Sequence, residues 1–256
     1  MNSLLSCHRI FLLVVVLFAT FAVEAPRSLS AEETPHDFLA AYLLPEDHPM
    51  KPKLDRIFDK AGVIKSRSAL KDNGFIVNTR RHPNNVLVAW HKRLKGHLLK
   101  IYTDDQPQMV DWQNWVKRIN GIEIVRAAIE RNGYGSLLKA PKKWMYRLPH
   151  IENPEDKQYI LVVEDMVVFS DDSNRKCWKN PGWVTNEHLQ ALFTVIKEEG
   201  LIDSLYIDNV PFSVDLRIAF VDTEHTNVWP VKFNNLSPYL SGKSRKFWES
   251  LFIENH

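Results

Sequence analysis

The stretch Ile202–His225, IDSLYIDNVPFSVDLRIAFVDTEH, places polar residues at the ends of short apolar runs. Its first half contains the pair Asp208-Asn209, which is followed by a turn with a proline. Its second half is an apolar run, Ile218–Val221, that stops at Asp222. Polar groups at this density, next to short strands, are typical of a binding or catalytic site. The stretch is therefore a candidate functional site, and the rest of the chain must indicate its fold and its chemistry.

The composition fits a globular protein with a sizeable core. The chain has 256 residues, 45% of them hydrophobic, which is enough for one large domain or two small lobes. Lys and Arg number 33 and Asp and Glu number 31, so the formal net charge of +2 is near balance. Nucleic-acid binding needs a basic excess gathered on one face, so this balance argues against a protein that wraps a polyanion.

The first 31 residues are predicted to be a signal peptide. The apolar run 10–23 suits the core of such a peptide and is shorter than the roughly 20 residues that span a bilayer. Cleavage after Ala31 predicts an exported protein, whether secreted, periplasmic or in the lumen of the secretory pathway. An uncleaved membrane anchor is the alternative. After cleavage Cys177 is the only cysteine, which excludes an internal disulfide and a metal site of cysteines.

The rest of the chain divides into three predicted regions. Residues 32–70 are predicted to form a helical N-terminal extension, because apolar residues recur at spacings of three and four around a proline-rich break. Residues 71–168 are predicted to be rich in strands and to end in a hinge, and residues 169–256 to form a smaller helical part. We therefore expect an α+β fold.

Five strands and one helix are predicted between residues 71 and 168. The strands are short runs rich in β-branched and aromatic residues, namely Phe75–Asn78, Val86–Trp90, Leu98–Tyr102, Trp144–Leu148 and Tyr159–Glu164. The first three are joined by short loops and predict an antiparallel meander with Lys100 inside its third strand. A broad apolar stripe predicts a helix over Trp112–Asn132, in which Gly121 is a candidate break.

The C-terminal part is predicted to contain two helices. Ser170–Gly182 has the composition of a polar linker. A helix is predicted over Glu187–Glu199, with its N-cap at Thr185 or Asn186 and a glycine at its end. A second helix is predicted over 243–252. The sequence contains no internal repeat and no low-complexity run.

This order of elements resembles the protein-kinase-like fold, in which a small sheet lobe with one helix leads through a hinge to a helical lobe. Lys100, in HLLKIY, matches the third-strand lysine that contacts nucleotide phosphates. The segment 159–166, YILVVEDM, is similar to the strand that enters the hinge, so Glu164 is expected at the cofactor site. Asn209 and Asp222, thirteen residues apart, match the catalytic-loop Asn and the Asp that opens the D-F-G motif. The resemblance covers roughly residues 74–224.

The resemblance implies ATP as a cofactor, together with Mg²⁺ or Mn²⁺. Phosphoryl transfer gathers negative charge that a lysine and divalent ions neutralise, and Mg²⁺ takes few oxygen ligands from the protein. By resemblance, Asn209 and Asp222 would hold the metal and Lys100 would contact the phosphates. A helix glutamate would pair with this lysine. Glu123 and Glu130 are both candidates for that partner, and Glu123 is preferred.

The sequence departs from the family's pattern in three places. The aspartate that the family keeps five residues before Asn209 is replaced by Ser204. Asp203, one residue out of register, and Asp208 are the remaining candidates for a catalytic base. The loop between the first two strands, TRRHPNN at 79–85, lacks the glycines that allow close backbone approach. Only 34 residues follow the predicted metal-binding aspartate, so a reduced helical lobe without an A-P-E motif is expected.

Three functions remain open from the sequence. The favoured one is an exported, degenerate kinase-like module, a pseudokinase, that binds a nucleotide in its cleft or a partner without turnover. The first alternative is an ATP- and Mg/Mn-dependent phosphotransferase that acts on an unidentified substrate. The second is a secreted binding protein with no nucleotide role. Other chemistries find no support, because the sequence has neither an H-E-x-x-H nor a G-x-S-x-G motif.

Overall fold

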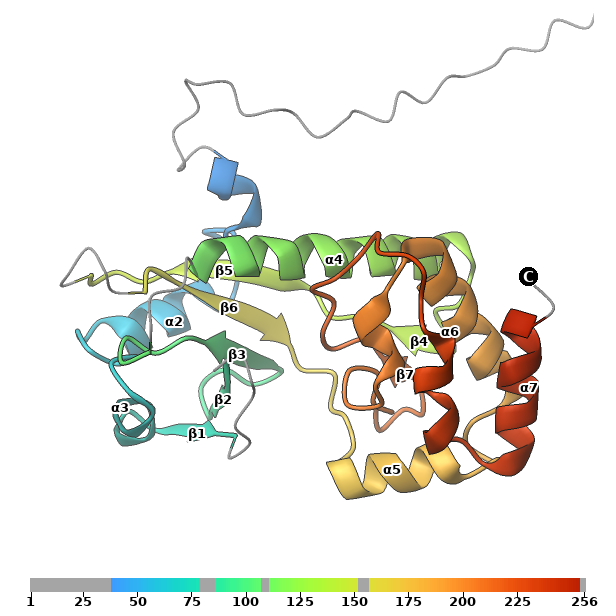
Figure 1. Ribbon diagram of the computed structural model, residues 1–256. Coiled ribbons are helices and arrows are strands. Elements are labelled where there is room, and N and C mark those ends of the chain that lie inside the picture. Colours follow the sequence, from blue (N-terminus) through green and yellow to red (C-terminus); the bar gives the residue numbers. More distant parts are fainter. Residues whose placement is uncertain (1–37, 79–85, 107–110, 152–156, 254–256) are drawn as a thin grey trace, which may run out of the picture. The chain divides into compact units, whose positions relative to one another are not determined.

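The computed structural model describes residues 38–78, 86–106, 111–151 and 157–253 of the chain. Its contacts join Leu39–His256 into one compact unit with an α+β fold (Figure 1). The predicted signal peptide and the 79–85 loop lie outside the described residues. Across the ranges that the structure describes, no helix combines the length and apolar character that crossing a membrane requires.

A single five-stranded antiparallel sheet contains all five predicted strands. In spatial order these are β1 (Phe75–Val77), β2 (Leu87–His91), β3 (His97–Ile101), β6 (Tyr159–Glu164) and β5 (Lys143–Arg147). The predicted meander β1-β2-β3 is confirmed. The pairing of β3 with β6, in which Lys100 lies opposite Leu161, joins the meander to the second pair of strands.

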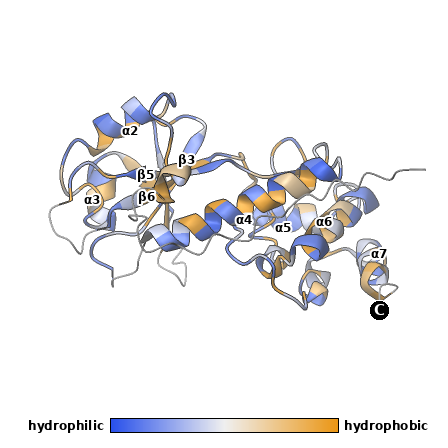
Figure 2. Ribbon diagram, turned by 90° about the horizontal axis from the view of Figure 1, so that it is seen from above, coloured by the Kyte–Doolittle hydropathy of each residue, from blue (hydrophilic) through white to orange (hydrophobic). Residues whose placement is uncertain are grey.

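One face of the sheet is covered by the N-terminal helices α2 (Lys51–Phe58) and α3 (Arg67–Asp72). These helices belong to the predicted helical extension, and their apolar residues enter the same hydrophobic core as the side chains of β1, β2 and β3. The contact is fixed by a hydrogen bond of 2.8 Å from the Tyr146 hydroxyl on β5 to Asp55 on α2. Figure 2 shows α2 and α3 beside the strands, with the hydrophobic and hydrophilic residues mixed along each helix.

The opposite face of the sheet carries α4 (Asp111–Arg131), the longest helix among the described residues. Trp115 of α4 is fully buried, stacks on Tyr102 with ring centroids 4.7 Å apart and donates to the Tyr159 carbonyl oxygen at 3.1 Å. The C-terminal half of α4 enters a second core instead, through residues such as Ile122 and Val125. The helix therefore packs against the sheet through Trp115 and contributes to the second core through its C-terminal half.

Gly121 does not interrupt α4, which runs through it without a break. A Cβ atom at this position would lie far inside van der Waals distance of the Thr223 carbonyl oxygen. The residue is a glycine because the backbone of the segment after Asp222 passes directly against the helix. The predicted break was wrong, since the missing side chain serves packing between elements and leaves the helical conformation intact.

The second core is built mainly from α6 (Asn186–Glu199) and α7 (Gly242–Ile253). The predicted ends of α6 are confirmed. The Thr185 side chain accepts the His188 amide at its N-terminus, and Gly200 has the left-handed conformation (φ 57°) that ends many helices. The helix predicted over 243–252 corresponds to α7.

The polar linker predicted over Ser170–Gly182 is wrong, because this segment contains helix α5 (Asp171–Lys179). Its buried side includes Cys177 and Trp178. The Asn174 side chain is buried as well, donating to the Ile207 carbonyl oxygen at 2.9 Å and accepting the Phe212 amide at 3.0 Å. The segment is mostly polar because only a narrow face of this helix is buried, and the one polar side chain on that face is hydrogen-bonded to backbone.

The apolar run before Asp222 forms a shorter strand than predicted. β7 covers only Ile218–Ala219 and pairs in parallel with β4 (Leu138–Lys139), a strand that the sequence did not indicate. The Val221 amide then donates to the Asn209 carbonyl oxygen at 3.0 Å, which ends the strand pairing and turns the chain. This hydrogen bond sets Asp222 next to the segment that carries Asn209.

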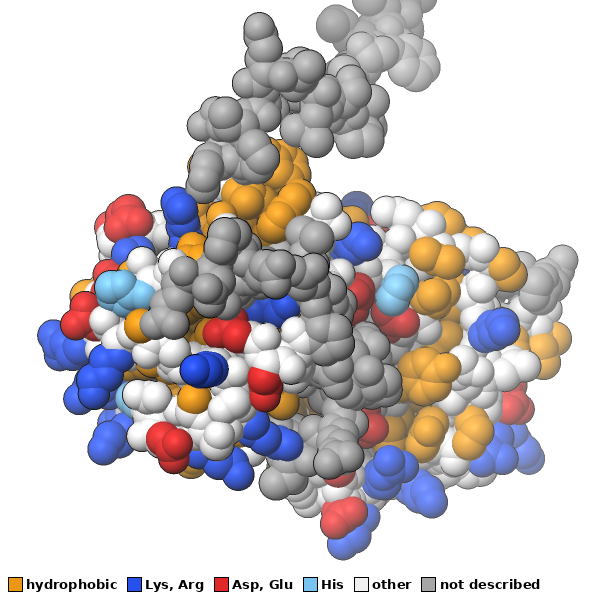
Figure 3. Space-filling model, turned by 60° about the vertical axis from the view of Figure 1, so that its left-hand side comes forward, with side chains coloured by type: hydrophobic (Ala, Val, Ile, Leu, Met, Phe, Trp, Pro, Cys, Tyr) orange, Lys and Arg blue, Asp and Glu red, His pale blue; other side chains and the backbone are white. Residues whose placement is uncertain are grey.

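Charged side chains are mixed on the face of the molecule shown in Figure 3. Lys and Arg lie among Asp and Glu there, and hydrophobic side chains gather over another part of the same view. Among the described residues of that face, Lys and Arg do not form a continuous basic surface of the kind that binds nucleic acids.

Gly121→Ala is expected to destabilise the protein by at least about 2 kcal/mol, because the added methyl group overlaps backbone that cannot move aside easily. Gly135→Ala is the matched control, since a Cβ at Gly135 meets no atom within 4 Å. Urea denaturation followed by circular dichroism measures both changes. Equal stability of the two variants would contradict the close approach of α4 to the 223–226 segment.

Candidate functional site

The structure brings Lys100 of β3 next to Asp222, the residue predicted to bind metal. The Lys100 ammonium nitrogen lies 3.6 Å from an Asp222 carboxylate oxygen and donates to the Val221 carbonyl oxygen at 3.3 Å. The Lys100 side chain is 10% exposed and that of Asp222 is 26% exposed, so solvent reaches the pair from the aspartate side. These two residues form the centre of the candidate site.

Arg118 of α4, which the sequence analysis did not single out, binds the carboxylates of both Asp222 and Glu224. One guanidinium nitrogen donates to Asp222, and the other donates to Glu224 at 2.6 Å. The Arg118 side chain is only 3% exposed. A sequence signal for it exists, because Arg118 lies three residues after Trp115, inside the apolar stripe of the helix. A charge at such a position needs a partner in the fold.

A second buried lysine, Lys143 at the start of β5, also faces this site. It lies opposite Val163 while Lys100 lies opposite Leu161, and residues two apart on β6 point to the same face of the sheet. The Lys143 ammonium donates to the same Val221 carbonyl oxygen, at 3.5 Å. Lys143 lies two residues before Met145 and so shares its face of the strand, which was the available signal that Lys143 points inward.

The buried network therefore holds three cations, Lys100, Arg118 and Lys143, against two carboxylates. Burial lowers the pKa of both lysines; for Lys143 the neighbouring Lys100 charge lowers the pKa further, well below its ordinary value. Burial acts to raise the pKa of Asp222, but the three surrounding cations outweigh it and hold that pKa well below its ordinary value. Asp222 is therefore ionised at neutral pH, and its charge is already matched by protein groups.

Asn209 and Asp203 lie beside the same strand end. The Asn209 side-chain amide donates to the Asp203 carbonyl oxygen at 2.9 Å, and the Asn209 carbonyl oxygen accepts the Val221 amide. The Asp203 carboxylate contacts His225, with 2.5 Å between its Oδ2 and the imidazole Nδ1. His225 was not among the predicted site residues. Its position three residues after Asp222 brings an acid–imidazole pair to the edge of the network.

The predicted ion pair between Lys100 and Glu123 is wrong. Glu123 is half exposed on α4 and pairs with Arg126 at 2.8 Å, one turn further along the helix. Glu130, the other candidate, is exposed near the end of α4. Within the described residues, the carboxylate beside Lys100 is that of Asp222, because the α4 residue facing the sheet at this level is Arg118.

Three other predicted residues take no part in the charged network. Glu164 lies opposite His97 at the far end of β3, and its carboxylate accepts the Lys142 amide at 2.8 Å. Asp208 is exposed on the turn before Asn209. Ser204, at the position of the missing catalytic aspartate, is buried, and its hydroxyl has no hydrogen-bond partner among the described residues.

The donor set does not fit a divalent metal ion. Over the part of the chain that the structure describes, no three His, Cys, Asp or Glu side chains are grouped to hold one. Asp222, the central predicted ligand, is bound by Arg118 and lies next to a buried lysine. A divalent cation at this carboxylate would have to displace the guanidinium and would be repelled by the remaining positive charges.

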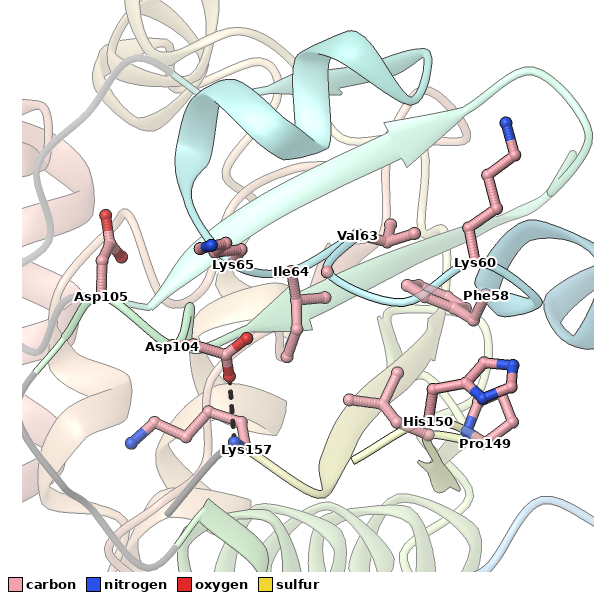
Figure 4. Close-up of a pocket in the computed structure, with 12 residues that line it drawn as sticks. Phe58, Lys60, Val63, Ile64, Lys65, Asp104, Asp105, Pro149, His150 and Lys157 are labelled. Carbon is pink, nitrogen blue, oxygen red and sulfur yellow. Dashed lines mark hydrogen bonds between the residues drawn. The ribbon is translucent and has the colours of Figure 1, made fainter. Parts of the chain in front are cut away.

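Two cavities differ in their position relative to the charged network, and one of them adjoins it. A cavity of about 300 Å³ lies on the α2 side of the sheet, where Asp104 accepts the Lys157 amide at 3.0 Å (Figure 4), and none of the predicted site residues lines it. Another, of about 690 Å³, lies along α4 and is lined in part by Glu224 and His225. The charged network therefore adjoins an open cavity on its Glu224 side.

No family model, curated protein or solved structure compared with the chain matches it. Any assignment of function therefore depends on the residues of the site and on their geometry.

Arg118→Met is expected to destabilise the protein by about 3 to 5 kcal/mol, because two partly buried carboxylates lose the guanidinium that binds them. Arg126→Met is the matched control on the same helix. Its exposed pair with Glu123 is worth at most about 0.5 kcal/mol. Urea denaturation at neutral pH compares the two, and a loss below about 1 kcal/mol for Arg118→Met would contradict the central role of this residue.

Lys143→Met is expected to stabilise the protein by about 1 to 4 kcal/mol, because it replaces a buried amine that lacks a carboxylate partner with an apolar chain of similar length. The pKa of Lys143 is lower in the folded than in the unfolded chain, where it is 10.5. The unfolded chain therefore binds more protons, and the destabilisation by Lys143 grows as the pH falls below 10.5.

The gain from Lys143→Met should accordingly be larger near about pH 6 than near about pH 9.5. Lys142→Met, at the exposed neighbouring position, is the control and should change stability by less than about 0.5 kcal/mol. Chemical denaturation at the two pH values measures both variants. A destabilised Lys143→Met protein would show that the amine stabilises the fold.

Proposed function

We propose that this chain is a kinase-like binding module that does not transfer phosphoryl groups. The kinase-like assignment is supported by the order of three sheet strands, a helix, the sheet strands β5 and β6 and then helices, and by the approach of Lys100 to Asp222. Asn209, which the same resemblance relates to Asp222, lies beside it through the Val221 hydrogen bond. These features argue for the fold. The groups around them argue against turnover.

The observation that carries the proposal is the binding of Asp222 and Glu224 by Arg118. Phosphoryl transfer depends on a divalent ion, which needs carboxylate oxygens with free lone pairs. Here the guanidinium occupies an Asp222 oxygen, and two lysines add further positive charge. The buried Ser204 removes the base as well, because a serine hydroxyl cannot accept the proton of a substrate as a carboxylate does.

An exposed apolar surface supports a binding role. Five of the ten large hydrophobic residues exposed among those described lie near the segment after β6 and the turn before β7. They are Val167, Val168, Trp183, Val214 and Leu216, each 37 to 57% exposed. Val167 and Leu216 have φ angles of 49° and 66°, which are costly for such side chains. Strained backbone that holds apolar side chains in water is a feature of interaction surfaces.

The turn that presents Val214 and Leu216 is rigidly held. Asp215, between them, accepts hydrogen bonds from Arg217 at 2.8 Å and from Lys139 at 3.1 Å. A surface fixed in this way loses little conformational entropy when a partner binds. The bracing supports a module that recognises a partner.

A metal-dependent phosphotransferase is the second candidate, and the contact between Asp203 and His225 favours it. In this alternative the Asp203 carboxylate, supported by the imidazole, takes the role of the base that Ser204 lacks. The exposure of Asp222 on one side would leave a path for a substrate.

The proposal predicts that ATP with Mg²⁺ or Mn²⁺ stabilises the full chain no more than ATP with EDTA, and that the chain hydrolyses no ATP. Thermal melting measures the first result, since a ligand that binds only the folded state raises the melting temperature. Asp222→Ala is the control for any effect of metal. Metal-dependent stabilisation that disappears in Asp222→Ala would overturn the proposal.

In that case Asp203→Ala tests the second candidate. A fall in turnover by roughly 10² to 10⁴ would assign Asp203 as the base. Unchanged turnover in this variant would remove the base role of Asp203.

A further inference from the structure

Two buried lysines converge on one carbonyl oxygen in the charged network. The ammonium nitrogens of Lys100 and Lys143 lie 3.3 and 3.5 Å from the Val221 oxygen. Two positive groups are therefore held close together in a region from which water is largely excluded. Like charges in such a place repel strongly unless an anion lies between them or one of them is neutral.

The two carboxylates of the network do not offset the charges of the two lysines equally. Arg118 binds both Asp222 and Glu224, and Asp222 also lies 3.6 Å from Lys100. Lys143, by contrast, has no carboxylate within ion-pair distance among the described residues, and the Val221 oxygen is the one acceptor near its ammonium. Lys143 is therefore the basic group of the network that lacks an anionic partner within the described ranges, and an anion bound beside it would favour its charged form.

We propose that Lys143 and Lys100 together bind one phosphate-class oxyanion, and that this group binds without a divalent metal ion. The inference rests on the proposed binding role, because a catalytic site would use a metal at Asp222 instead. An ammonium group recognises a phosphate oxygen as a point charge and donates up to three hydrogen bonds to it. Two converging ammonium groups carry two positive charges, where a divalent ion and a single lysine carry three in a phosphotransferase.

The exposed side of the network is the side of Asp222 and Glu224, so a ligand would reach the lysines from there. Asp222 and Glu224 keep 26% and 18% of their side chains exposed, whereas Lys143 is almost fully buried. Because Arg118 binds both carboxylates and offsets part of their charge, they repel an incoming anion less than free carboxylates would. A site that keeps a cation at a cost in stability is also an expected property of a functional position.

Inorganic phosphate, tripolyphosphate and ATP, each titrated in EDTA, test the site by thermal melting of the full chain. Sodium chloride at equal ionic strength is the control for general screening. We expect at least one of the three phosphate compounds to raise the melting temperature in a saturable way. A response to all three identifies the phosphate group alone as the ligand, and a response to ATP alone identifies a nucleotide.

Lys143→Met provides the matched test, with Lys142→Met as its control. The apparent affinity should weaken by about tenfold or more in Lys143→Met, because one of the two ammonium groups is lost. It should be unchanged in Lys142→Met. No saturable response to any phosphate compound, or an equal response in Lys143→Met, would overturn the inference.

This failure is distinguishable from failure of the proposed function. ATP hydrolysis with Mg²⁺ would contradict the non-catalytic role and would leave metal-free binding of phosphate to be judged on its own titration. Absence of any response to phosphate would remove the oxyanion site and would leave the metal test of catalysis unaffected.

Discussion

The structure depends most on the contact between one guanidinium and two carboxylates. Arg118 lies in the middle of α4, is almost fully buried and binds Asp222 and Glu224 after β7. Separating these groups would leave three charges in a poorly hydrated place, which is far more costly than losing a surface ion pair. The contact therefore fixes the helix that covers the sheet against the segment that leaves the parallel pair of strands.

Close backbone packing also fixes α4 against the segment after β7. Gly121 lies less than one turn after Arg118, and the absence of a side chain there lets the Thr223 carbonyl approach the helix. On the sheet side, Trp115 stacks on Tyr102 and donates to the Tyr159 carbonyl oxygen. One helix thus contacts both the sheet and the second core. Movement of α4 away from the sheet would break apolar, polar and charged contacts at once, so we infer a site of fixed geometry.

The two buried lysines destabilise this region, and the proposed oxyanion site depends on them. Lys143 and Lys100 lie near each other with a shared carbonyl acceptor, and burial disfavours the charged form of both. Replacing such groups with apolar side chains commonly stabilises a protein. The same excess of positive charge repels a metal ion and attracts an anion. One electrostatic property therefore accounts both for the unsuitability of Asp222 as a metal ligand and for the proposed oxyanion site.

Most local elements follow from the sequence alone, because strand alternation, the apolar stripe of α4 and the cap and stop of α6 depend on neighbouring residues. It also indicated that Lys100, Asn209 and Asp222 belong together, through the resemblance of their order and spacing to a known fold. It could not reveal α5, whose buried face is only a few residues wide, or the packing role of Gly121. The partners are visible only in the folded chain, where Lys100 meets Asp222 and not Glu123, Arg118 binds the same carboxylate, and Lys143 joins them. Local patterns indicate that Arg118 and Lys143 point inward, but the partner of each one depends on contacts between segments far apart in the chain.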